Sequence, residues 1–414
     1  MPRLPDSLGA LRHDNFRWYW TATTVNLAGT TMSGVALAFA VLSITDSASA
    51  LGIVLAAETI PTAALMLLGG VIADRLPLTA VLRVGMVVLG ASQGAVATLV
   101  LTHTARIWMI VVLAVVNGVA NALTFPALQS ILPRLVPAEL LQQANALQSF
   151  ARGSLRVVGP TVSALLVVGV GAGWALAFDA ATWLAAAAIL VKVRLPPRPS
   201  REDRPSTFVE LREGWTYFRS TQWLWVVVLA FSMLNLVQVG ALSTLGPPRA
   251  KETFGIAGWG LFLSVESVGL IATTLVMLRR PLRRPLLSGM LGIGLISLPM
   301  LVLGLRPDLP LLVVCGFAAG AGTEVFSMGW NLAMQEQVPE AMLSRAISYD
   351  VLGSIIAVPV GELLYGPLGE SFGYRDVLVV SGVVYAAICL VTLSSRSVRG
   401  LRRVPADPLA VPQT

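Results

Sequence analysis

Charge is the scarcest property of this sequence. Asp, Glu, Lys and Arg make up 12% of its 414 residues, against about a quarter in soluble globular proteins. Hydrophobic residues supply 55% of the chain, and the mean hydropathy is +0.76. The net charge of +7 does not indicate a nucleic-acid-binding domain, because the arginines are not gathered on a soluble segment. The composition therefore predicts an integral membrane protein.

Cysteine and histidine are each present only twice. Cys315 and Cys389 lie in apolar segments and lack the spacing of a disulfide framework or a zinc site. His13 and His103 lie near segment ends, and no H-E-x-x-H or G-x-S-x-G pattern occurs. A phosphate-binding G-x-x-x-x-G-K-S/T loop is also missing. We expect no enzymatic activity, no metal, no cofactor and no ATP hydrolysis by this chain.

Long apolar runs fill most of the sequence, and a membrane-spanning helix needs about 20 such residues. Twelve runs are long enough. They fall near 16–43, 49–73, 79–101, 107–132, 138–170, 173–192, 223–245, 258–278, 286–304, 310–335, 343–368 and 376–395.

Basic residues set the expected orientation, because Lys and Arg accumulate on the cytoplasmic side of membranes. With the N-terminus inside, 22 of the 29 basic residues are cytoplasmic, five are external and two lie within a span. We therefore predict that both termini are cytoplasmic. The expected organisation is a six-helix bundle (1–192), a cytoplasmic linker (193–222), a second six-helix bundle (223–396) and a cytoplasmic tail (397–414).

The linker begins with a Pro-rich stretch and continues as PSTFVELREGWTYF. The spacing of its apolar residues predicts a short amphipathic helix lying at the membrane interface. The apolar side of this helix is expected to hold Phe208, Leu211, Trp215 and Phe218.

The two halves of the chain resemble each other. LGIVLAAETIP and WGLFLSVESVG carry Glu58 and Glu266 at matching places, and Gly52 aligns with Gly260. VPAELLQQANAL likewise matches VPEAMLSRAISY, with Val, Pro, Leu and Ala in register. Two repeats of six spans predict a binding site between the halves, near the middle of the membrane.

Three motifs resemble the major facilitator superfamily, and the likeness covers essentially the whole chain. GGVIADRL is similar to the loop motif after span 2, to which Gly70, Asp74 and Arg75 correspond. LRVVGPTVSALL is similar to the span-5 pattern of the exporter branch, matched by Gly159 and Pro160. PEAMLSRAISY resembles the branch of enterobactin exporters and macrolide efflux proteins. The resemblance implies an all-α membrane protein with twelve transmembrane helices in two pseudo-symmetric bundles.

These motif residues are candidates for a conformational gate. Asp74, in the loop motif with Gly70 and Arg75, can accept hydrogen bonds from the N-terminus of a neighbouring helix, which would hold one side shut. A solvated loop charge is the alternative. Gly159 and Pro160 permit a bend and close helix approach in span 5, or form a packing notch that does not move.

Charges within the spans mark either a partner or a function, because a charge at the bilayer centre costs at least ~2.5–3.5 kcal/mol. Glu58 lies roughly 24 Å from the cytoplasmic face, at a depth comparable with Arg152 and Arg156. The two arginines are four residues apart and share one helix face. They are expected either to pair structurally with Glu58 or to take part in transport, and both are candidates for lining the substrate cavity.

Glu266 is the first candidate for a proton carrier, because its own half contains no intramembrane arginine and burial favours the protonated form. A hydrogen-bonded structural carboxyl is the alternative. Asp350 and Glu324 are the next candidates, after Glu58. Glu362 is expected to reach water from near a helix end, and Asp179 to lie at the membrane interface.

Uncharged polar residues are the remaining cavity candidates. Asn26 and Asn235 lie on spans that border the central cavity in the superfamily that the chain resembles. Gln238 is expected either to line the cavity with them or to make an interhelical hydrogen bond. Aromatic residues reach only 7%, and no aromatic cage for a cation stands out. A largely aliphatic cavity favours a bulky, partly apolar solute.

The leading hypothesis is proton-coupled efflux of a hydrophobic drug, siderophore or other natural product across a bacterial cytoplasmic membrane, with multidrug resistance as a consequence. An importer or lipid transporter with the same fold is the first alternative, and a non-transporting membrane sensor or assembly factor is the second. The expected partners are a small-molecule substrate, protons and the lipid bilayer, without nucleic acid, and the chain is expected to act as a monomer.

Overall fold

The structure is a computed structural model that describes residues 6–75, 78–194, 215–277, 279 and 282–402. Within this part of the chain the fold is helical, and twelve helical segments are long and apolar enough to cross a membrane. Helices satisfy every backbone hydrogen bond within the segment, which the bilayer interior requires. The predicted number of spans is therefore confirmed.

The first half of the chain forms six spanning helices. They are α1 (Asp14–Thr45), α2 (Ala48–Arg75), α3 (Leu78–Leu101), α4 (Ile107–Ile131), α5 (Leu141–Val170) and α6 (Ala172–Leu190). Short 3₁₀ helices precede α1 and connect α4 to α5, at Asp6–Arg12, Leu132–Arg134 and Ala138–Leu140.

The second half forms six spans from shorter pieces. They are α8 (Gln222–Gln238) with the π-helical segment η4 (Val239–Thr244) and α9 (Gly246–Thr253); α10 (Gly255–Met277); α11 (Pro285–Ile293) with η5 (Gly294–Ile296) and α12 (Ser297–Leu305); α13 (Leu309–Gln337); α14 (Glu340–Ile355) with α15 (Val358–Phe372); and α16 (Tyr374–Ser394). A short helix, α17 (Arg396–Arg399), follows.

Three of the runs predicted as continuous spans contain an irregular segment, which in the run over 223–245 is the π-helical η4. The span expected over 343–368 divides at Ile356–Ala357, just before Pro359, and the one over 286–304 contains a 3₁₀ turn. Proline lacks the backbone N–H that an α-helix interior needs, which accounts for the break before Pro359. Hydropathy does not register such breaks because the residues on both sides are apolar.

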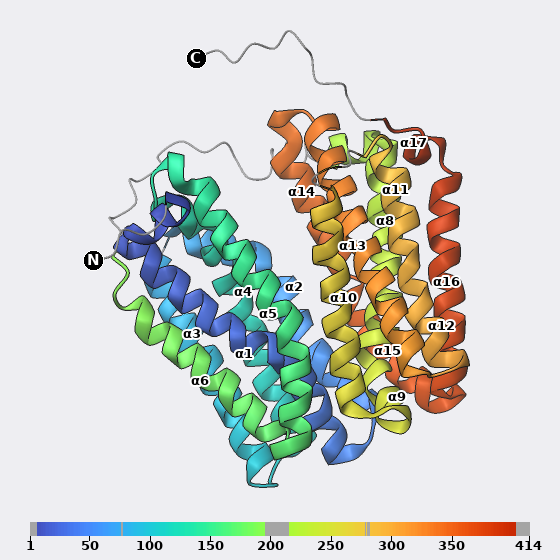
Figure 1. Ribbon diagram of the computed structural model, residues 1–414, viewed down its shortest axis with the longest axis horizontal. Helices are drawn as coiled ribbons and strands as arrows, with labels where there is room; N and C mark the ends of the chain where they lie inside the picture. Colours follow the sequence, from blue (N-terminus) through green and yellow to red (C-terminus); the bar gives the residue numbers. More distant parts are fainter. Residues whose placement is uncertain (1–5, 76–77, 195–214, 278, 280–281, 403–414) are drawn as a thin grey trace.

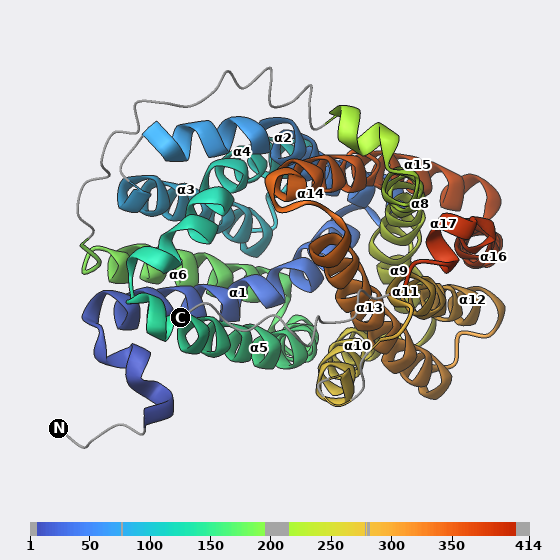
Figure 2. The same cartoon turned by 90° about the horizontal axis from the view of Figure 1, so that it is seen from above.

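The helices form two bundles that meet at one end of the molecule. Figure 1 shows the bundles converging where α9 lies beside the turn between α1 and α2, and diverging toward the end at which both termini lie. We call these the far end and the terminal end. The most extensive contacts between the bundles join α5 to α10 and α2 to α15, and Figure 2 shows the bundles side by side from above.

The buried apolar clusters follow the arrangement of the two bundles. One continuous cluster of buried residues includes Leu51 of α2 and Trp259 and Phe262 of α10, and so spans both bundles toward the far end. Toward the terminal end the clusters are separate: one is centred on Phe16 and Leu82 of the first bundle, and another lies in the second bundle. Apolar packing therefore joins the halves only over part of their length.

Two aligned glycines allow the bundles to touch. Gly52 of α2 lies against the backbone carbonyl of Glu362, and Gly260 of α10 lies against that of Pro160. A Cβ atom at either glycine would collide with the opposing backbone. The internal repeat seen in the sequence thus corresponds to a repeated point of close approach between the halves.

Candidate functional site

Glu58 of α2 has an amide as its partner. The Asn121 side chain on α4 donates a hydrogen bond to Glu58 Oε1 at 3.1 Å, within the first bundle. Among the described residues no ion pair joins Glu58 to Arg152 or Arg156, so the structural pairing considered from the sequence is wrong. Equal depth along the membrane did not imply contact, because α5 packs on α1 and α10.

Glu266 of α10 lies at the contact between the bundles. Its electrostatic neighbour is Arg156 on α5, from the other half of the chain. Within the described part of the structure Glu266 makes no hydrogen bond, in contrast to Glu58. The sequence showed no arginine for Glu266 in its own half; the structure supplies one across the contact between the bundles.

The remaining candidates for proton coupling are hydrogen-bonded within the second bundle. Trp330 Nε1 donates to Asp350 Oδ2 at 2.9 Å, and Ser354 Oγ donates to the other carboxylate oxygen at 3.4 Å. Thr274 donates to Glu324 Oε1 at 2.9 Å. These contacts join α13 to α14 and α10 to α13, so a movement of one bundle against the other leaves them in place.

Asp179 was expected at the membrane interface, but it is 1% exposed within the first bundle. Gln93 Nε2 donates to Asp179 Oδ2 at 2.9 Å and also lies 2.7 Å from Ser33 Oγ. Asp179 Oδ1 is buried without a partner among the described residues. Hydropathy gave no sign of this burial, because an aspartate near a span end usually faces the interface.

Glu362 was expected to reach water, and this is also wrong. It is 5% exposed on α15, where Thr59 of α2 donates to its Oε1 at 3.1 Å across the contact between the bundles. Its Oε2 is buried and has no partner in the part of the chain that the structure describes. Glu58 interacts electrostatically with both Glu362 and Asp179, so three carboxyl groups follow one another from α6 through α2 to α15.

A cavity of about 200 Å³ lies within the first bundle. Asn26 and Arg152, both predicted as cavity residues, line it together with Tyr19 and Gln148. The Asn26 side-chain nitrogen is buried and has no partner among the described residues. The cavity therefore presents an unused donor and a cation on otherwise mixed walls.

Asn235 and Gln238, the cavity candidates of the second bundle, have different contacts. The Asn235 side chain donates to the Ser354 carbonyl at 3.0 Å, joining α8 to α14. Gln238 is the last residue of α8 and directly precedes the π-helical segment η4. A π-helical insertion leaves a helix locally irregular and is often found at functional sites.

The structure describes the surroundings of only two of the predicted gate residues, Gly159 and Pro160. Gly70, Asp74 and Arg75 fall in the last turns of α2, and their side chains lie outside the described residues. Gly159 packs against Thr31 of α1, while Pro160 presents its carbonyl to α10 without ending α5. This Gly-Pro pair therefore lies where α5 meets both α1 and the other bundle.

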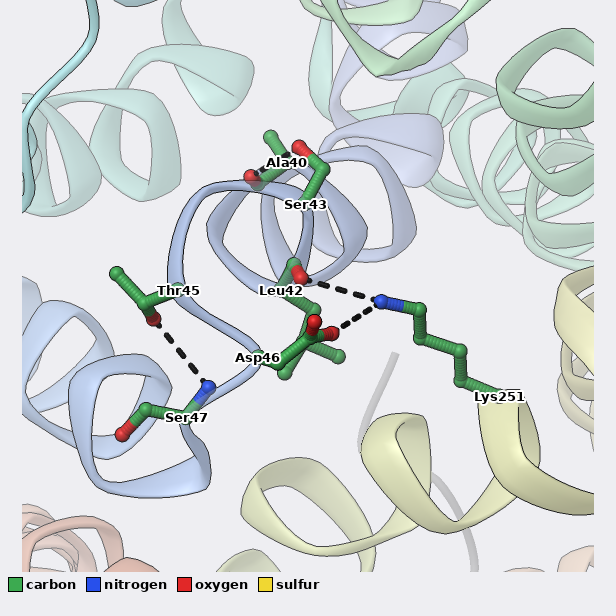
Figure 3. Close-up of polar contacts among 7 residues, drawn as sticks. All are labelled: Ala40, Leu42, Ser43, Thr45, Asp46, Ser47 and Lys251. Carbon is green, nitrogen blue, oxygen red and sulfur yellow. Dashed lines mark hydrogen bonds and ion pairs between the residues drawn. The ribbon is translucent and has the colours of Figure 1, made fainter.

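Polar contacts close the far end around the turn between α1 and α2. Figure 3 shows Lys251 of α9 paired with Asp46 and donating to the Leu42 carbonyl, at 3.2 Å. Leu42 belongs to the last turn of α1, where the helix dipole favours a cation. Asp46 itself has a positive φ of 50°, which asparagine and aspartate tolerate best among residues with a side chain.

The start of α2 is held by an anion from the other bundle. Glu370 of α15 accepts hydrogen bonds from the Ser47 hydroxyl at 2.8 Å and from the Ser49 amide and hydroxyl at 3.0 and 2.6 Å. A carboxylate at a helix N-terminus satisfies free amides and complements the dipole. The second bundle thus supplies a cation to the end of α1 and an anion to the start of α2. We call these contacts the far-end latch.

Twelve spans in two bundles that touch at one end and diverge at the other, with carboxyl groups at the contacts, define a transporter of the major facilitator fold. The model of the transmembrane secretion effector family matches residues 6–409. The chain belongs to this family, within the major facilitator superfamily, and is a multi-pass membrane transporter rather than an enzyme.

Known proteins agree with this assignment. Macrolide efflux protein A of Streptococcus pyogenes is 23% identical over 398 residues, covering 93% of this chain and 97% of that protein. The enterobactin exporter EntS of Shigella boydii is 26% identical over 371 residues, covering 86% of each chain.

Solved structures show the same fold. A bacterial homologue of the human lysosomal transporter Spinster, inward-facing and unoccupied, superposes with a TM-score of 0.72 at 16% identity, covering 95% of this chain and 99% of that one. The nucleoside transporter NupG gives 0.74 at 12% identity, covering 92% and 98%. The predicted resemblance to the major facilitator superfamily is confirmed.

Proposed function

We propose that this protein exports a partly apolar small molecule across a bacterial cytoplasmic membrane in exchange for protons. One relative is named as a macrolide efflux protein and the other as an enterobactin exporter. The observation that supports the coupling is the position of Glu266, whose electrostatic neighbour Arg156 belongs to the other bundle, across the α5–α10 contact.

The proposed orientation places both termini in the cytoplasm, in keeping with the 22 basic residues that then lie inside. The far end is then the external end, and the described conformation is inward-facing. Alternating access would require the far-end latch of Lys251 and Glu370 to break as the external side opens.

Glu266 is the proposed proton carrier. Protonation would remove its attraction to Arg156 and weaken the α5–α10 contact, whereas loss of the proton would restore it. Glu58, Asp350 and Glu324 keep partners within their own bundle and are therefore lesser candidates. The proposed substrate contacts are Asn26 and Arg152, which line the cavity in the first bundle, and Asn235 and Gln238 of the second bundle.

Drug susceptibility tests this proposal. A bacterial strain without its own efflux pumps is transformed with the wild-type gene and challenged with a panel of amphiphilic antibiotics. We expect resistance to at least one compound, loss of that resistance with Glu266→Gln, and most of it retained with Glu324→Gln, because Glu324 is bonded within one bundle.

Membrane content of each variant is measured in parallel, so that poor insertion is not mistaken for lost coupling. Equal resistance from wild type and Glu266→Gln on every compound would contradict the coupling role of this residue. Absence of resistance from the wild type on the whole panel would contradict the export of amphiphilic antibiotics.

A further inference from the structure

We propose that the cavity of about 200 Å³ in the first bundle is a subsite for an oxyanion, such as a carboxylate, of the transported molecule. This inference rests on the proposed function, since it names a chemical group that the exported solute carries. It adds Gln148 to the predicted residues Asn26 and Arg152, and it gives all three side chains the role of hydrogen-bond donors.

The cavity is too small for a whole drug-sized molecule, because sites that enclose one have volumes of about 300–1,000 Å³. It lies between α1, α4 and α5, in the half of each helix that is nearer the terminal end. The cavity is not enclosed, and Phe125 on its wall is 47% exposed. A functional group can therefore enter the cavity while the rest of the molecule stays outside it.

Two amide groups on the walls have hydrogen-bond donors without acceptors. Asn26 is only 9% exposed, and its Nδ2 atom has no partner among the described residues. Gln148 Nε2 is likewise buried and has no partner in the part of the chain that the structure describes. Buried donors without acceptors are costly, so a ligand that brings acceptor oxygens is favoured.

Two hydroxyl groups on the same walls are already used. Tyr19 donates to the Leu128 carbonyl at 3.2 Å, and Thr23 donates to the Tyr19 carbonyl at 3.0 Å. Their protons are therefore directed at backbone carbonyls rather than at a ligand. None of the described residues that line the cavity is acidic, so the cavity offers donors and holds no negative charge of its own.

Arg152 supplies a positive charge to the cavity. It lies within a span, and among the described residues no carboxylate forms an ion pair with it. Arg156, one turn further along α5, differs because Glu266 of the other bundle is its electrostatic neighbour. A cation within the membrane marks a partner or a substrate path, and the planar guanidinium group matches a carboxylate in geometry. The unmatched charge of Arg152 therefore favours an anion over a neutral group.

A matched pair of dyes isolates the proposed group. Rhodamine 19 has a free carboxylate where rhodamine 6G has an ethyl ester, and the two dyes share one cationic chromophore. Binding of each dye to the purified full-length protein in an uncharged detergent is measured by fluorescence anisotropy. We expect the wild type to bind rhodamine 19 roughly tenfold more tightly than rhodamine 6G, because hydrogen bonds to a charged group are the stronger ones.

Three variants test whether this preference arises in the cavity. Arg152→Gln removes the charge, and we expect it to reduce the preference for rhodamine 19 to less than about twofold. Asn26→Asp replaces a donor by a carboxylate and should abolish the preference. Arg106→Gln is the matched control, because it removes the same charge from an exposed position before α4, at the other end of that helix from Phe125. It should leave the preference unchanged.

A competition measurement distinguishes a solute from a lipid as the source of the oxyanion. Hexanoate and phosphatidylglycerol are each added to the complex of the wild type with rhodamine 19. Hexanol and phosphatidylcholine are the respective counterparts without net charge. We expect hexanoate to displace the dye and hexanol to leave it bound. Displacement by phosphatidylglycerol but not by hexanoate would assign the cavity to a lipid headgroup and overturn the proposal.

Two further results would overturn it. One is an equal Kd of the wild type for the two dyes, and the other is a preference for rhodamine 19 that Arg152→Gln and Asn26→Asp leave unchanged. Failure of the proposed function looks different. A wild-type protein that prefers rhodamine 19 in the binding measurement but exports neither dye from cells would keep the subsite and remove the assignment as an exporter.

Discussion

The two contacts between the bundles share one architecture and differ in what they leave open. Each has a glycine, Gly52 or Gly260, packed on a backbone carbonyl of the other half. At α5–α10, Thr161 donates to Ser264 at 2.7 Å beside the packed backbones. At α2–α15, Thr59 donates to Glu362 at 3.1 Å, and an apolar groove lined by residues of α2, α14 and α15 lies next to this contact. The internal repeat therefore gives two points of close approach with different polar contacts.

The largest expected effect comes from placing a side chain at a glycine where the two bundles touch. Gly260→Val puts side-chain atoms onto the Pro160 backbone, and overpacking of this kind costs about 1–3 kcal/mol. That cost falls on the conformation closed at the far end, so we expect export to drop more than tenfold. Gly169→Val on α5 is the control, because a Cβ there meets nothing within 4 Å. Similar export rates for these two variants would show that the close approach is not needed.

A smaller effect is expected from the latch. Replacing a helix-capping side chain costs about 0.5–2 kcal/mol, so Glu370→Ala should shift the equilibrium toward the externally open state by roughly two- to thirtyfold. Distances between spin labels across the far end measure this shift. Lys251→Met should act in the same direction.

Glu252→Gln provides the matched control for the latch. Its pair with Arg249 is half-exposed and lies within α9, so its loss should change the distance distribution little. Distance distributions that match among Glu370→Ala, Lys251→Met and the wild type would mean that the latch does not hold the external side closed.

The smallest effect is expected from the hydrogen bond between Thr161 and Ser264 at the α5–α10 contact. Thr161→Val removes a hydrogen bond between the bundles worth about 1 kcal/mol, and export should fall up to about fivefold. Thr274→Val removes a bond of similar length within the second bundle. It should lower the unfolding temperature without a comparable change in the spin-label distances. The reverse pattern would place the moving contact inside a bundle.

Much of the fold could be predicted because a membrane-spanning helix is recognisable as a long run of apolar residues. Twelve apolar runs gave twelve spans, and the alignment of Gly52 with Gly260 corresponded to two points of close approach. The motifs led to the correct superfamily. The breaks before Pro359 and at Gly294–Ile296 were missed, since apolar residues continue through both.

The site was less predictable, because partners across helices depend on rotation and packing that hydropathy does not encode. Glu58 and Glu266 lie within candidate spans, yet their neighbours, Asn121 and Arg156, emerged only from the packing of α2 on α4 and of α5 on α10. Glu362 was placed in water, although α2 covers it with Thr59. A search for polar residues matched in height across the two halves could have found that pair.

The central claim is that a carboxyl group at a contact between the bundles couples proton movement to export, and inside-out vesicles test it most directly. Rhodamine 6G, a fluorescent amphiphilic cation, is added to the inside-out vesicles that contain the protein. An entrapped pH-sensitive dye records the pH of the lumen. We predict that rhodamine 6G uptake drives protons out of wild-type vesicles and that Glu266→Gln binds rhodamine 6G without moving protons. Equal proton movement in wild-type and Glu266→Gln vesicles would contradict the account. Uptake of rhodamine 6G by the wild type without proton movement would contradict it as well.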